Sequence, residues 1–235
     1  MMLSPESYYE LHLKGMSEKE ILSVIRGLKN QIGHLKNIME HPQYGREPLV
    51  RPTEAVRIWC TRLYLERAKQ ALFEMGASYA PSQAEVNSKQ FQENIDYISR
   101  IRLEYGGYFG GYEAYTITVG KDHIHFDLEH SLHEKTTNLP DAVDYLMSKD
   151  EFLNGLRELY IGEWRRNYRT ERFGYVVLDG TQWSLQIEYS NGAKPLSYYG
   201  SNSYPYNFGK LKDLFGIEDD IDDEEDIGAK ESFSL

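Results

Sequence analysis

In the stretch Ile101–Glu129, IRLEYGGYFGGYEAYTITVGKDHIHFDLE, apolar and polar side chains alternate. The apolar positions of this alternation are Ile101, Leu103, Tyr105, Tyr115, Ile117, Val119, Ile124, Phe126 and Leu128. A period of two is typical of half-buried β-strands. The stretch therefore predicts three antiparallel strands joined by short connections.

The glycine-rich segment GGYFGG, residues 106–111, lies between the first two of these strands. A loop that binds phosphate needs a helix after it and often a lysine, and here a strand follows. The segment therefore predicts a hairpin turn, with Tyr108 and Phe109 at an exposed tip. Because loops often carry binding residues, we expect both aromatic side chains to contact a partner.

The same alternation returns further along the chain. The elements expected there are helices over Asp141–Met147 and Lys149–Arg166, strands over Tyr175–Leu178, Trp183–Tyr189 and Lys194–Tyr199, and a short helix over Asn207–Phe215. Ser190-Asn191-Gly192 is typical of a hairpin turn. The loop SNSYPYN, residues 201–207, contains Tyr204 and Tyr206 around a stiffening proline. We expect these two tyrosines to contact a partner, with the alternative that Tyr206 only packs against Leu211 at the start of the last helix.

Toward the N-terminus the period changes to that of helices. Ser4-Pro5 and the capping box Ser17-x-x-Glu20 predict two helix starts, and Thr53 predicts a third helix that ends near Gly76. Apolar residues of the second helix form a seam spaced by four and three residues: Ile21, Ile25, Leu28, Ile32, Leu35 and Met39. The seam favours an antiparallel hairpin with the third helix, and the alternative is a homodimer zipper.

Three regions follow from this pattern: a helical domain over residues 1–80, an α+β domain over 81–217, and an acidic tail over 218–235. Their net charges are +2, −5 and −8, which together give the −11 of the chain. The fold class is α+β: an N-terminal helical hairpin, then antiparallel β-meanders with packed helices, and a disordered tail.

Composition bears on location and chemistry. One cysteine, Cys60, excludes an internal disulfide, and the start of the chain lacks the pattern of a signal peptide. No stretch is apolar enough to span a membrane, so we expect a cytoplasmic protein. Motifs of nucleotide-binding loops, hydrolase nucleophiles and zinc proteases are absent from the sequence, and we expect no cofactor and no direct binding of nucleic acid.

The histidine-rich segment KDHIHFDLEHSLH is the candidate for metal chemistry. His123, His125 and Asp127 would share one face of a strand, and alternate strand residues are a spacing that metal sites use. The alternative is that these side chains form the solvated face of the sheet. A metal-dependent enzyme that uses His123 and His125 is therefore one hypothesis.

Three segments carry a resemblance: FLNGLRELYIGEWRRNY (152–168), VLDGTQWSLQIEYSNG (177–192) and YYGSNSYPYNF (198–208). They resemble uncharacterised small proteins of Gram-positive anaerobes that are often carried on phages and mobile elements. The resemblance brings no catalytic residues. It implies an anti-defence factor, such as an anti-CRISPR protein that binds an RNA-guided nuclease.

The leading hypothesis is a non-enzymatic binding protein that inhibits a host complex acting on nucleic acid. A folded body with a net charge of only −3 departs from a mimic of DNA, so we expect recognition through protein–protein contacts. The alternatives are the metal-dependent enzyme and a structural homodimer.

Overall fold

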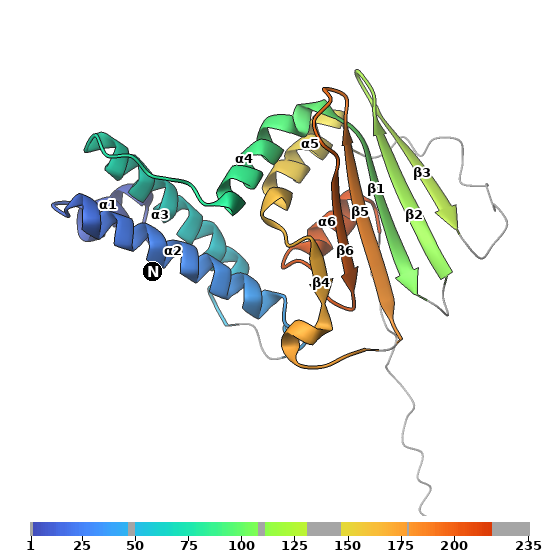
Figure 1. Ribbon diagram of the computed structural model, residues 1–235, viewed down its shortest axis with the longest axis horizontal. Helices are drawn as coiled ribbons and strands as arrows, with labels where there is room; N and C mark the ends of the chain where they lie inside the picture. Colours follow the sequence, from blue (N-terminus) through green and yellow to red (C-terminus); the bar gives the residue numbers. More distant parts are fainter. Residues whose placement is uncertain (1, 47–49, 108–110, 131–146, 178, 218–235) are drawn as a thin grey trace, which may run out of the picture.

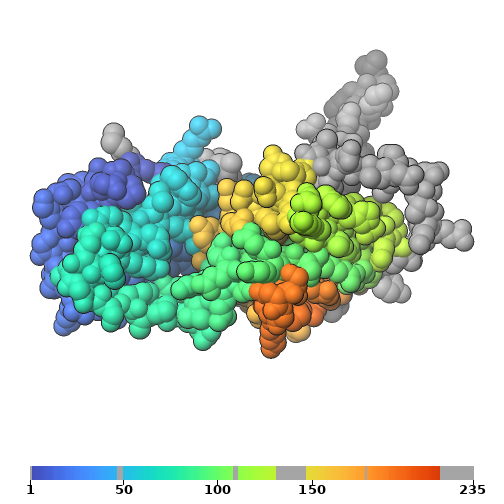
Figure 2. All heavy atoms as spheres, turned by 90° about the horizontal axis from the view of Figure 1, so that it is seen from above, coloured from blue at the N-terminus to red at the C-terminus, as the bar shows by residue number. Residues whose placement is uncertain are grey.

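The computed structural model describes residues 2–46, 50–107, 111–130, 147–177 and 179–217. It has a helical part and a part in which helices cover one face of a six-stranded sheet (Figure 1). Seen from above, the helical part and the sheet part lie next to each other along the long axis of the molecule (Figure 2). The predicted α+β class with N-terminal helices is confirmed.

The helical part contains α1 (Pro5–His12), α2 (Glu18–Met39) and α3 (Glu54–Glu74). All three begin at the expected caps: the Ser4 and Thr53 side chains accept hydrogen bonds from backbone amides, and Ser17 forms a capping box with Glu20. The seam of α2 is buried against α3 from Ile21 to Leu35. The predicted intramolecular hairpin is therefore confirmed, and the seam is already occupied within the chain.

The short helix α1 packs against α3 through aromatic rings. Tyr8 stacks on Tyr64 with ring centroids 4.3 Å apart, and the Arg67 guanidinium lies 3.9 Å from the centroid of Tyr9. The Tyr64 hydroxyl also exchanges hydrogen bonds with the backbone of Leu3. These contacts cover one side of α3, while α2 covers another.

The sheet has the strand order β3-β2-β1-β5-β6-β4. Its strands are β1 (Ile98–Gly107), β2 (Gly111–Val119), β3 (Ile124–His130), β4 (Asn167–Arg169), β5 (Thr181–Tyr189) and β6 (Leu196–Ser201). The meander β1–β2–β3 and the hairpin β5–β6 join edge to edge through antiparallel pairing of β1 with β5. The two stretches of alternation therefore form one continuous sheet.

Helices α4 (Gln83–Asn94), α5 (Lys149–Glu158) and α6 (Phe208–Leu214) lie on one face of this sheet (Figure 1). The core between them contains Ile101, Leu103, Ile117, Leu185 and Ile187 from the strands and Phe91, Phe152, Leu156 and Leu211 from the helices. The helical part has a separate cluster centred on α2 and α3. Buried apolar residues thus form two clusters, one in each predicted region.

Two close contacts join the segments 177–192 and 198–208. The Trp183 indole donates a hydrogen bond of 2.9 Å to the Ser203 carbonyl, and a Cβ at position 200 would lie 2.0 Å from its nitrogen. The carboxamide of Asn202 accepts from the Thr181 amide, and it fills the space that a side chain at Gly180 would need. The two glycines, the tryptophan and the asparagine therefore have a structural role.

The structure corrects the region between α5 and β5. The helix expected to reach Arg166 ends at Glu158, because Tyr160 adopts a left-handed conformation with φ of 50°. The strand expected over Tyr175–Leu178 is wrong for the described residues 175–177, which have no regular structure. Instead β4, which periodicity could not indicate in three residues, pairs in parallel with β6.

The helix expected over Asp141–Met147 lies outside the described residues, except for Met147. The predicted tail, residues 218–235, also lies outside them. Within the described part of the chain, no helix combines the length and the apolar character needed to cross a membrane.

Candidate functional site

One side of α3 carries apolar side chains that do not belong to the buried cluster of the helical part, with the exposed polar residues Glu66 and Gln70 between them. We define the α3 outer face as Val56, Trp59, Leu63 and Phe73, whose spacing places them on one side of the helix. Trp59 is 61% exposed and Phe73 is 74% exposed. Two large aromatic side chains so exposed on one helix face are a feature of protein-binding surfaces.

This surface cannot be recognised from the apolar pattern of α3 alone. The apolar residues of α3 lie on almost every side of the helix, since Ile58, Leu65 and Leu72 are buried in the hairpin. A helix that is apolar all round is normally buried on all sides. The sequence pattern does not distinguish Trp59 from the buried apolar residues of α3, and only the packing shows that it is exposed.

A charged junction joins the helical part to the sheet part. At its centre the Glu163 carboxylate contacts Lys36 of α2 and accepts hydrogen bonds of 2.8 and 2.7 Å from Arg62 of α3. Burial would raise the pKa of Glu163, but the hydrogen bonds from Arg62 and the two positive charges outweigh it and lower that pKa to about 2. Glu163 is therefore a carboxylate that two buried cations need as their partner.

Two further clusters strengthen the junction. Glu85 of α4 binds Lys29 at 2.6 Å and Lys69 at 3.1 Å, and Glu40 at the end of α2 binds Arg172 at 2.7 Å. The clusters around Glu163 and Glu85 line a groove of about 690 Å³ between α2, α3 and α4. We call it the junction groove. Most of its charged groups are already paired, so its polar chemistry serves to hold the two parts together.

The predicted contact tyrosines are half-buried. Tyr204 packs between Trp183 and Phe208, with ring centroids 6.5 and 5.0 Å away. Tyr206 packs on the helical cluster under Lys36, whose ammonium lies 5.1 Å from its ring centroid. Both rings thus have a structural role, and a role in partner binding stays a prediction. Tyr108 and Phe109 lie outside the described residues.

The histidine-rich segment forms the edge of the sheet. His125 lies 3.2 Å from Asp127 on β3, and both side chains are more than half exposed. His130 lies 3.1 Å from Glu113 of β2, whereas His123 precedes the strand, beside Gly120. Among the residues that the structure describes, no three metal-binding side chains converge. The arrangement is that of a solvated strand face.

Cys60 is buried on α3, and its sulfur lies 3.0 Å from the sulfur of Met2. Burial raises the pKa of its thiol above the ordinary value, which disfavours the thiolate. The cysteine therefore has the environment of a packing residue.

Comparison of the chain with known protein families, curated proteins and solved structures finds no match.

Proposed function

We propose that this protein is a non-enzymatic binding protein that inhibits a complex acting on nucleic acid, such as an RNA-guided nuclease, inside the cell. The observation that supports it is the α3 outer face. Trp is among the residues that contribute most to protein–protein binding when it enters a pocket of the partner. On a rigid two-helix scaffold, Trp59 would make that contact at little cost in conformational entropy.

Charge supports the class of partner. Residues 218–235 have a net charge of −8, and the chain as a whole has −11. Proteins that bind nucleic acid carry basic surfaces, which an acidic segment attracts and speeds in association. A partner with a basic surface and an apolar pocket therefore fits this chain better than a second, equally acidic copy.

Cleavage of DNA by a purified RNA-guided nuclease of the Cas9 type tests the proposal directly. We expect the protein in excess to suppress cleavage, and Trp59→Ala with Phe73→Ala to restore it, with binding at least tenfold weaker. Tyr97→Ala is the matched control, because Tyr97 is a half-exposed aromatic residue on the sheet part. It should leave inhibition unchanged.

Two results would contradict the proposal. Undiminished cleavage together with no complex in size-exclusion chromatography would exclude this class of partner. A dimer in light scattering that Trp59→Ala dissociates would assign the α3 outer face to a second copy of the chain.

A further inference from the structure

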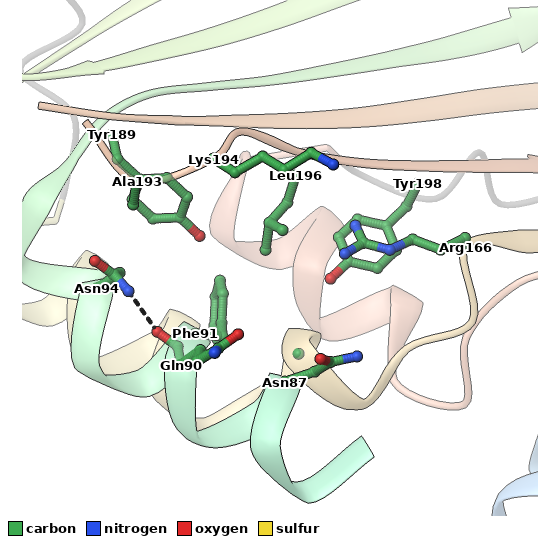
Figure 3. Close-up of a pocket in the computed structure, with 11 residues that line it drawn as sticks. Asn87, Gln90, Phe91, Asn94, Arg166, Tyr189, Ala193, Lys194, Leu196 and Tyr198 are labelled. Carbon is green, nitrogen blue, oxygen red and sulfur yellow. Dashed lines mark hydrogen bonds between the residues drawn. The ribbon is translucent and has the colours of Figure 1, made fainter. Parts of the chain in front are cut away.

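A second hollow lies on the other side of α4, between this helix and the β5–β6 hairpin (Figure 3). Its volume is about 370 Å³, which falls within the range of sites for small molecules. We call it the hairpin pocket. Its lining comes from α4, from the turn that contains Gly162, from Arg166, and from residues 189–198.

The helical side presents polar amides. Asn87, Gln90 and Asn94 recur every three or four residues, so α4 directs all of them to the same side as Phe91. Asn94 is held by the turn of the hairpin, since its side chain oxygen accepts a hydrogen bond of 2.7 Å from Asn191. The Gln90 carboxamide has no hydrogen-bond partner within the described chain, and the Asn87 side chain only accepts one from Gln83.

The sheet side presents two phenols. Tyr198 is 1% exposed and Tyr189 is half-buried, and within residues 2–46, 50–107, 111–130, 147–177 and 179–217 neither hydroxyl has a hydrogen-bond partner. Burial raises the pKa of Tyr198 to about 12, so its hydroxyl keeps its proton. Neither hydroxyl is among the buried polar atoms of the described residues that lack a partner, so both are accessible from the pocket, where a ligand can bind them.

Among the described residues that line the pocket, the charged side chains are Arg166 and Lys194, which are both basic. The Arg166 guanidinium lies 4.8 Å from the ring centroid of Tyr198 and donates to the Ser197 carbonyl at 3.2 Å. Both cations are exposed, and in the described part of the chain neither forms an ion pair, so both can bind an anion.

These groups are of three kinds: cations at the rim, carboxamides on one wall, and aromatic rings with apolar Leu196 between. Arginine and lysine bind phosphate, and carboxamides pair with the edges of nucleobases. A base can stack on an accessible aromatic ring, and of the rings here Tyr189 is half-buried, whereas Phe91 and Tyr198 are 2% and 1% exposed. We propose that the hairpin pocket binds a small phosphorylated ligand with a planar, hydrogen-bonding ring, the chemistry of a nucleoside monophosphate. This site is separate from the α3 outer face and does not depend on the proposed function.

Calorimetric titration of the full chain with AMP, GMP, CMP and UMP at millimolar concentrations tests the proposal. Inorganic phosphate, ribose 5-phosphate and adenosine are the partial ligands. We expect at least one nucleotide to bind at least tenfold more tightly than each of these fragments, because the fragments lack either the phosphate or the ring.

Two variants assign the contacts. Arg166→Gln should weaken nucleotide binding at least tenfold, while Arg169→Gln, an exposed arginine on β4 that does not line the pocket, should leave it unchanged. Gln90→Ala should weaken binding of the nucleotide and not of ribose 5-phosphate. Arg166, Arg169 and Gln90 are all exposed, so we expect each of the three variants to fold like the parent protein.

Three results would overturn the proposal. They are the absence of binding by all four nucleotides, equal affinity for ribose 5-phosphate and the nucleotides, and an equal loss of affinity in Arg166→Gln and Arg169→Gln.

Discussion

The two hollows that flank α4 differ in how their polar groups are used. In the junction groove, Glu163 and Glu85 each bind two cations, so nearly every charge already has a partner. In the hairpin pocket, two cations and two hydroxyls lack such partners within the described residues. Buried charges that are paired with each other fix the relative positions of the elements that carry them. Donors without a protein partner beside a pocket can instead form hydrogen bonds with a ligand. The difference separates a structural hollow from a candidate binding site in one molecule.

The largest effect is expected when a carboxylate of the junction groove is removed from its ion pairs. Glu163→Gln leaves Lys36 and Arg62 buried without their carboxylate, and we expect a loss of about 3 kcal/mol in the free energy of unfolding. Urea denaturation measures it. Glu66→Gln is the control, because Glu66 is 69% exposed beside Lys69 and should cost under about 1 kcal/mol. Similar losses in both variants would show that the groove is not structural.

Acid should act through the same carboxylate. The pKa of Glu163 is about 2 in the folded protein and 4.5 as its ordinary value, so the unfolded chain takes up this proton first as pH falls. Its contribution is complete above about pH 4.5 and is lost between there and pH 2, amounting to about 3 kcal/mol.

Acid titration of unfolding free energy in the parent protein and in Glu163→Gln measures this contribution. We expect the parent to lose more stability across that interval than the variant. Parallel curves would contradict the assignment of the low pKa to Glu163.

Separating α4 from the neighbouring turn should disturb both hollows together. A Cβ at Gly162 would lie 2.6 Å from the Cα of Ser88 and 2.8 Å from the Asn87 carbonyl oxygen, and neither atom can move without moving the helix. We expect Gly162→Ala to cost about 2 kcal/mol of stability.

Thermal denaturation measures this loss, with Gly209→Ala as the control. Gly209 lies within α6 and a Cβ there meets nothing within 4 Å, so alanine should be neutral or slightly stabilising. No loss in Gly162→Ala would mean that α4 is free to move away from the turn.

The smallest effect is expected from removing the hydroxyl group of one of two buried tyrosines, Tyr168 or Tyr198. Tyr168 and Tyr198 are both 1% exposed, but within the described residues only the Tyr168 hydroxyl has a partner, accepting from the Arg165 amide at 3.1 Å. We expect Tyr168→Phe to cost about 1 kcal/mol and Tyr198→Phe to stay within about 0.5 kcal/mol of the parent. Chemical denaturation of both variants checks this. An equal cost would show that the Tyr198 hydroxyl is satisfied in the free protein.

The residues that form the candidate sites come together only through tertiary contacts, which the sequence does not predict. The hairpin that carries Tyr198 is predicted from the sequence, but not that it faces the helix that carries Gln90. Local patterns carry no information on pairs about a hundred residues apart. Likewise, Trp59 follows the apolar pattern of α3, and only the positions of α1 and α2 show which of its faces is covered.

Elements whose signals are local could be predicted from the sequence. The caps at Ser4, Ser17 and Thr53, the seam of α2, and the alternation in β1, β2, β3 and β5 each depend on side chains within a few residues. Tertiary structure decided the rest: the pairing of β1 with β5, the end of α5 at Glu158, the parallel strand β4, and the choice between a paired groove and an unpaired pocket. The physical reason is that hydrogen bonds between distant strands, and charges from distant helices, acquire partners only when the chain has packed.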